Sequence, residues 1–107
     1  DVSHEHDDAV TSFVFRHAEP LDLERLDLFL GEIVQTHGAQ LMRYKGVLNI
    51  RDIAERVVFQ GVHMLMGHDL GAPWHPDEAR ASKIVFIGRD MPREILERGL
   101  AQCVAKS

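Results

Sequence analysis

The hydrophobic pattern of the first forty residues predicts a strand followed by a helix. Residues 10–16, "VTSFVFR", are rich in β-branched and aromatic side chains, which favour strands. The apolar residues that follow recur at intervals of three and four, the spacing of one helix face. They are Leu23, Leu26, Phe29, Leu30, Ile33 and Val34. Asp22 is a suitable N-cap for this helix and Gly38 a suitable terminator.

Residues 39–50, "AQLMRYKGVLNI", alternate between apolar and polar positions and predict a second strand. Tyr44 and Leu48 fall on its apolar side, whereas Arg43 and Lys45 fall on the opposite side. We therefore expect one face of this strand to be buried and the other to be open.

Three further segments follow. Residues 56–67, "RVVFQGVHMLMG", are apolar on both sides, as expected of an interior strand, and Gly61 among them indicates a bulge or a close backbone approach. Residues 68–81 contain two prolines and the only tryptophan and predict a long loop. Residues 82–88, "SKIVFIG", predict the fourth strand.

The chain closes with a second amphipathic helix, for which Asp90 lies near the cap and Pro92 in the first turn. Its apolar stripe consists of Ile95, Leu96, Leu100, Cys103 and Val104. The predicted order is β-α-β-β-β-α. We expect an α+β two-layer sandwich, a four-stranded sheet with both helices on one face, because each helix must bury its stripe.

Composition and charge are those of an ordinary globular domain. The 107 residues suffice for one domain with its own core. Much of the net charge of −5 comes from four acids within residues 1–8, so that residues 9–107 carry only about −1. This balance predicts neither a nucleic-acid nor a membrane partner. A single cysteine, Cys103, excludes an internal disulfide and a cysteine-built zinc site within this chain. We also expect a cytoplasmic protein.

The first eight residues, "DVSHEHDD", suit either a metal-binding segment or a solvated linker. His4 and His6 share one side of an extended backbone, so both imidazoles can reach one ion, and imidazole with carboxylate suits Zn²⁺ or a related divalent ion. Two histidines are nevertheless fewer than the four ligands of a usual structural zinc site. Both interpretations stay open at this stage.

No catalytic constellation is apparent in the sequence. The chain has no G-x-x-x-x-G-K-[ST] phosphate loop and no H-E-x-x-H motif, so we expect no catalysis and no cofactor in this chain itself. His63 is expected to pack within a strand. His68 and His75 flank the predicted loop and could converge there, although no spacing requires it.

The features of an interaction surface are more informative. Arg43 and Lys45 lie on the open side of the second strand, and Trp74 lies between two prolines in the predicted loop. A sheet with helices on one side leaves its other side free for a partner. Trp74 either belongs to that surface or folds back to cover the sheet, and the sequence favours neither.

Several short segments in a fixed order resemble the C-terminal domain of the CobW family, whose members are P-loop GTPases of the metallochaperone type. These segments are the R-x-K-G pattern of Arg43, Lys45 and Gly46, "VFQGV" of residues 58–62, Trp74, and "VFIGRD" of residues 85–90. The resemblance runs from about Thr11 to Val104 and covers nearly the whole chain.

This resemblance implies the C-terminal part of a longer protein, and a chain that begins with Asp rather than Met agrees with that expectation. Family members carry an N-terminal GTPase domain with a cysteine-rich metal motif, and many have a His- and acid-rich linker. Residues 1–8 are then expected to be a stub of the linker, and residues 9–107 the C-terminal domain. GTP would bind only the missing domain, and zinc or cobalt only the linker, at His4 and His6.

The resemblance also implies an accessory module in GTP-dependent delivery of zinc or cobalt, related to cobalamin synthesis. Its expected partners are its own GTPase domain and a metalloprotein client. The alternative is a stand-alone α+β module, unrelated to GTPases, that binds a small ligand or self-associates through the sheet face. A homo-oligomer is compatible with both.

Overall fold

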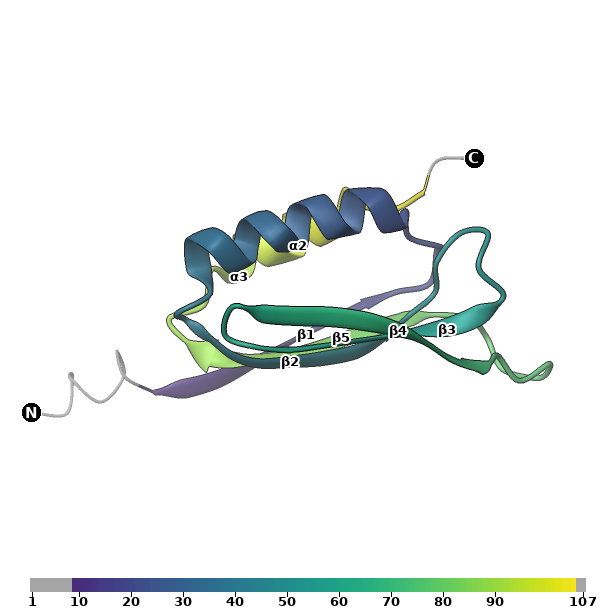
Figure 1. Ribbon diagram of the computed structural model, residues 1–107, viewed down its shortest axis with the longest axis horizontal. Coiled ribbons are helices and arrows are strands. Elements are labelled where there is room, and N and C mark those ends of the chain that lie inside the picture. Colours follow the sequence, from purple (N-terminus) through teal and green to yellow (C-terminus); the bar gives the residue numbers. More distant parts are fainter. Residues whose placement is uncertain (1–8, 106–107) are drawn as a thin grey trace, which may run out of the picture.

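A computed structural model describes residues 9–105 and shows two layers, a sheet and a pair of helices (Figure 1). The elements are β1 (Val10–His17), α2 (Leu23–His37), β2 (Leu41–Leu48), β3 (Glu55–Val62), β4 (Leu65–Pro73), β5 (Ser82–Arg89) and α3 (Arg93–Ala101). The five strands form one antiparallel sheet in the order β1-β5-β2-β3-β4. Both helices lie on the same side of the sheet, as predicted (Figure 1).

The prediction of four strands is wrong by one. Residues 56–67 do not form a single strand, because the chain reverses at His63 and Met64 to make the β3–β4 hairpin. His63 has a φ of 51°, in the left-handed region, and its side chain is exposed instead of packed within a strand. β4 continues to Pro73, so the loop predicted for residues 68–81 begins only after that residue.

The fifth strand was missed because it carries little strand signal. β4 lies at the edge of the sheet, and most of its side chains are exposed. Its sequence therefore does not need to alternate between apolar and polar residues. Gly67, Gly71 and Pro73 add loop-like composition. Hydrogen bonding to β3, rather than burial of its own side chains, keeps this segment extended.

Helix α2 agrees with its prediction at both ends. The Asp22 carboxylate accepts a hydrogen bond from the backbone N–H of Arg25 at 3.1 Å, as an N-cap should. Gly38 follows the helix with a φ of −57°, so no left-handed turn requires glycine there. A Cβ at Gly38 would instead collide with the carbonyl of Val34 and lie 2.8 Å from Met64 Cγ. The close Val34 carbonyl, with Met64 of the hairpin beside it, explains this glycine.

Helix α3 is shorter than predicted. It starts just after Pro92 and ends at Ala101, so Cys103 and Val104 lie beyond its end. Leu96 and Leu100 are buried as expected, whereas Ile95 is 51% exposed and does not belong to the buried stripe. Beyond the helix, the Cys103 carbonyl accepts a hydrogen bond from the Asp22 N–H, and Val104 pairs with Leu21.

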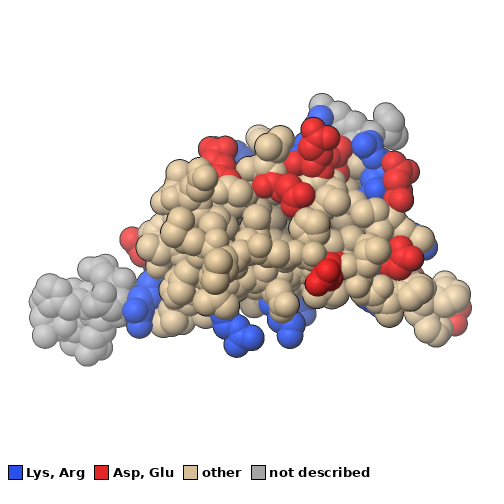
Figure 2. All heavy atoms as spheres, viewed as in Figure 1, with Lys and Arg blue, Asp and Glu red and all other residues tan. Residues whose placement is uncertain are grey.

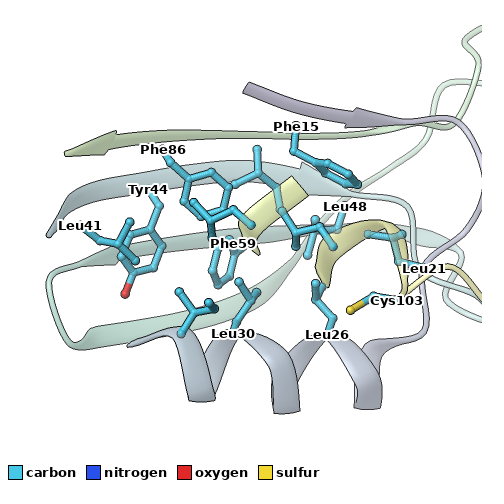
Figure 3. Close-up of a cluster of buried hydrophobic side chains, with 14 of the residues drawn as sticks. Phe15, Leu21, Leu26, Leu30, Leu41, Tyr44, Leu48, Phe59, Phe86 and Cys103 are labelled. Atoms are coloured by element: carbon cyan, nitrogen blue, oxygen red, sulfur yellow. The ribbon is translucent and has the colours of Figure 1, made fainter. Parts of the chain in front are cut away.

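The core fills the space between the sheet and the helices (Figure 3). Its aromatic part consists of Phe13, Phe15, Tyr44, Phe59 and Phe86. The last four lie on the side of the sheet that the helices cover (Figure 3), and Phe13 packs against Phe86. Leu26 and Leu30 reach it from α2. With this face of the sheet occupied, the opposite face is left to solvent.

Candidate functional site on the open face of the sheet

The side chains of the open face come from strand positions that alternate with the core. On β2, Tyr44 and Leu48 are buried, whereas Arg43 and Lys45 are exposed, as the sequence predicts. β2 lies in the middle of the sheet, between β5 and β3. Both basic residues therefore project from the centre of the open face.

The register of β5 against β2 brings three further residues to the same place. Lys45 lies opposite Val85, and Arg43 lies opposite Ile87. Lys83, two positions before Val85, shares their face. The centre of the open face thus combines basic and aliphatic side chains.

Strand β1 extends this arrangement. Val14 pairs with Val85, and Arg16 pairs with Lys83. Both β1 residues are exposed, since Phe13 and the other core residue of this strand take the opposite face. The result is an aliphatic strip with basic residues at its borders.

A surface depression of about 450 Å³ lies over β2 and β5. It is lined by Arg43, Tyr44, Lys45, Gly46, Val47, Lys83, Val85 and Ile87. Most of its surface is apolar, and the charged groups come from the Arg and Lys side chains. Aliphatic walls with cationic borders suit a ligand or partner that offers apolar groups and carboxylates or phosphates.

The charges of the domain are distributed unevenly between its two layers. Figure 2, in the orientation of Figure 1, shows Lys and Arg along the lower side, which is the open face, and most of the visible Asp and Glu over the helices and the loops. Within residues 9–105, no ion pair involves Arg43, Lys45 or Lys83. These cations are available to a partner that carries negative charge.

Trp74 directly follows β4 and lies against Arg56 of β3. The Arg56 guanidinium sits 4.8 Å from the centre of the indole ring and donates a 2.8 Å hydrogen bond to the carbonyl of Pro73. Trp74 is half-buried, and its indole N–H is buried without a hydrogen-bond partner in the described part of the chain. Trp74 does not line the depression that contains Arg43 and Lys45.

Glu78 stabilises the loop that follows Trp74 through two hydrogen bonds. Its carboxylate accepts hydrogen bonds from the backbone N–H of His75, at 2.6 Å, and from the Arg56 guanidinium. The His75 hydrogen bond, followed by the positive charge of Arg56, lowers the pKa of Glu78 below its ordinary value of 4.5. Trp74 therefore has a packing role at the end of β4, and its predicted role in an interaction remains a prediction.

The histidines do not assemble into a metal centre among residues 9–105. His4 and His6 lie outside the described residues, so the predicted metal site remains a prediction. His68 lies 3.4 Å from Asp27 of α2, whereas the backbone N–H and ring of His75 contact residues of its own loop. No group of three or more His, Cys, Asp or Glu side chains in this part of the chain could hold a metal ion.

Cys103 is an interior side chain rather than a reactive one. It is 3% exposed, and its thiol donates to the carbonyl of Gly99 at 3.3 Å. Burial raises the pKa of this thiol above its ordinary value of 9.0, which keeps it protonated and unreactive. Cys103 is therefore buried, as its position in the predicted apolar stripe requires.

Sequence reasoning missed several residues of the open face, among them Arg16, Lys83, Val85 and Ile87. The alternation of "SKIVFIG" contained the signal for three of them, because Lys83, Val85 and Ile87 occupy every second position. What the pattern did not reveal was that β5 pairs with β2. None of the described helices is long and apolar enough to span a membrane.

Comparison with known proteins matches residues 10–104 to the family model described as the cobalamin synthesis protein cobW C-terminal domain. The zinc chaperone YjiA of Escherichia coli (strain K12) is 33% identical over 92 residues, which cover 86% of this chain and 29% of that protein. The zinc chaperone CobW of Pseudomonas aeruginosa is 30% identical over 76 residues, or 71% of this chain and 20% of that protein.

The fold is also that of a solved relative. The crystal structure of Zn(II)-bound YjiA GTPase from E. coli superposes with a TM-score of 0.86 at 30% identity, covering 97% of this chain and 32% of that one. The chain spans less than a third of the length of these relatives. The matched part is named for a C-terminal domain, so the chain corresponds to an accessory domain and not to a GTPase domain. This chain belongs to the family of CobW C-terminal domains.

Proposed function

We propose that this domain is the docking module of a GTP-dependent metal chaperone and that it binds its own GTPase domain through the open face of its sheet. Family membership and the similarity to two zinc chaperones support the chaperone role. The open face supports the docking role, because it is the large face that the helices leave uncovered.

The observation that carries this proposal is the placement of Arg43 and Lys45. Both project from the middle strand of the sheet, beside Val85 and Ile87, and neither has an ion-pair partner within residues 9–105. Exposed cations and aliphatic side chains contribute little to the stability of an isolated domain. They are well suited to a partner that covers them.

The metal would be bound by other parts of the parent protein. His4 and His6 remain the candidate ligands in this chain, as the end of a metal-handling linker, with carboxylates beside them. The names of the relatives favour zinc, while cobalt would use the same ligand types. A metalloprotein client would receive the ion.

Calorimetry on the 107-residue chain tests the role. We expect no binding of GTP, and at most weak binding of Zn²⁺ or Co²⁺ that is lost when His4→Ala and His6→Ala are combined. Tight GTP binding by this chain would contradict the proposal. The parent gene offers an independent test, because it should encode a G-x-x-x-x-G-K-[ST] loop upstream of Asp1.

Docking is tested by titrating this chain with the separately expressed GTPase domain. Lys45→Glu should leave folding intact and weaken binding, because Lys45 is exposed and has no ion-pair partner among residues 9–105. Arg98→Glu makes the same charge change on the exposed surface of α3 and should bind like the wild type. Equal binding by both variants would show that the docking surface lies elsewhere.

The alternative function is binding of a small ligand by a stand-alone domain. The depression of about 450 Å³ favours it, since its volume falls in the range of small-molecule sites. Under this alternative the open face would bind an anionic, partly apolar small molecule and would not bind a GTPase domain.

A further inference from the structure

We infer that the element seated on the open face is an amphipathic helix of the GTPase domain, with an aliphatic stripe bordered by Asp and Glu. This inference rests on the proposed docking function and adds the chemistry of the partner.

Hydrogen bonding in the sheet excludes an added strand at this position. β5 pairs with both β1 and β2, and β2 pairs with both β5 and β3. Their backbone groups therefore have partners on both sides, and an incoming segment must contact side chains alone. A helix satisfies its own backbone groups, whereas an extended segment lying across this face would leave its own unpaired.

The apolar residues have the dimensions of one helix. Val85 and Ile87 lie about 6.7 Å apart along β5, and Val14 lies about 5 Å away across the pair with β1. A helix with its side chains is about 10 Å wide and covers roughly two strands. Arg43 and Lys45 border this strip on the β2 side.

The charge of the face selects an acidic partner. Its exposed bases are Arg16, Arg43, Lys45, Lys83 and Arg89. Among the described strand residues, Asp69 on the edge strand β4 is the acid on this face, and the carboxylate of Glu78, from the loop after β4, is already paired with Arg56. A second copy of the chain would place one basic face against another and is disfavoured by repulsion. A helix with carboxylates beside its apolar stripe would pair with the cations and cover the aliphatic strip together.

Nucleic acid fits less well, although the face is basic. Single-stranded nucleic acids bind by stacking bases on exposed aromatic side chains. The strands β1, β2 and β5 direct their aromatic residues to the helix side, where Phe13, Tyr44 and Phe86 are buried. The open face offers aliphatic side chains in their place.

The test is a titration of this chain with three designed helical peptides of about 18 residues, followed by fluorescence anisotropy. The first has a Leu stripe bordered by Glu, the second has Lys for every Glu, and the third has Ser for every Leu. We expect only the first to bind, with an affinity that falls as salt increases. Lys45→Glu should weaken it about fivefold or more, whereas Arg98→Glu should not.

Exchanging the charges on the open face provides a more specific test of the partner's charge. The double variant Arg43→Glu with Lys45→Glu should lose the Glu peptide and gain the Lys peptide. Equal binding of the Glu and Lys peptides by the wild type would overturn the inference, and so would binding to vesicles of anionic phospholipid in the absence of binding to the Glu peptide.

The two proposals fail in different ways. If Lys45→Glu weakens docking of the GTPase domain but the wild type binds the Glu and Lys peptides equally, the inference is wrong and docking through the open face stands. If the Glu peptide binds as expected but the GTPase domain does not, the docking function is wrong and the open face accepts an acidic helix of another protein.

Discussion

The ring of Tyr44 on β2 occupies the space that Gly61 on β3 leaves empty. The two residues are register partners, and the Tyr44 hydroxyl donates a 2.9 Å hydrogen bond to the carbonyl of His63 in the turn of the hairpin. The same ring packs against Phe59, with 5.5 Å between the ring centres. The bulge or close backbone approach predicted for Gly61 is therefore wrong: the strand pairing is regular there, and the glycine makes room for an aromatic side chain that fixes the β3–β4 turn.

Gly61→Ala should destabilise the domain by about 1–3 kcal/mol, because the added Cβ would overlap the Tyr44 ring. Gly67→Ala is the matched control, since nothing lies within 4 Å of a Cβ placed there. That change should be neutral, or stabilising by up to about 1 kcal/mol. Urea unfolding of both variants measures the difference, and equal midpoints would contradict this account.

Ser82→Ala should cost about 1–3 kcal/mol, although it removes a single oxygen. Ser82 is 1% exposed, and its hydroxyl accepts a 2.9 Å hydrogen bond from the backbone N–H of Asn49. Without that acceptor, a buried donor has no partner. Thermal unfolding should show the loss, hydrogen exchange at the Asn49 amide should accelerate, and Ser12→Ala on the exposed surface of β1 should change neither.

Glu78 should ionise at a lower pH than an ordinary Glu, because the His75 N–H and the Arg56 guanidinium favour its charged form. A carboxylate with a lowered pKa stabilises the fold fully above its ordinary value of 4.5, and this contribution is lost as the pH falls through the lower folded value. Carbon NMR titration of the Glu78 carboxylate measures it directly.

Arg56→Gln should raise the pKa of Glu78 only part of the way to the ordinary value, since the hydrogen bond from His75 remains. Arg98→Gln, which lies on α3, is the control and should leave the titration unchanged. A full return to the ordinary value in the Arg56 variant would mean that the backbone hydrogen bond has no effect.

The Cys103 thiol should react with iodoacetamide about a thousandfold or more slowly in the folded protein than in urea. Burial both shields the sulfur and raises its pKa. Because the pKa of the thiol is higher in the folded than in the unfolded protein, the protonated thiol contributes fully to the free energy of unfolding below the unfolded pKa. This contribution declines as the pH rises above the unfolded pKa. Rapid labelling under native conditions would show that the α3 end opens independently of the rest.

The sequence predicted the buried elements better than the exposed ones. Leu26 and Leu30 reveal α2 through their spacing, because a helix that packs on a sheet must keep one apolar stripe. β4 has no such requirement, and its strand character comes from β3 beside it. The pattern of β4 alone therefore contains little evidence of a strand. The turn at His63 and Met64 also lacks the Gly or Asn that usually marks a tight hairpin turn in a sequence.

The candidate site was predicted in part for a related reason. Arg43 and Lys45 were identified by alternation within one strand, which is local information. Their neighbours Lys83 and Val85 come from a segment some forty residues away, and only the pairing of β5 with β2 brings the two together. The charge balance of residues 9–107 is close to neutral, and the pairing is what concentrates its cations on one face.

The strand order has a consequence for how this domain forms during synthesis. β1 is synthesised before the other strands, yet its neighbour in the sheet is β5. The pairing of Val14 with Val85 therefore cannot form until some seventy further residues have been made. The β2–β3–β4 meander can assemble early through short connections, because each strand pairs with the next. Until β5 emerges and inserts between the two parts, Phe13 and Phe15 stay unburied, and a nascent chain stopped before Ser82 would expose them to chaperones and proteases.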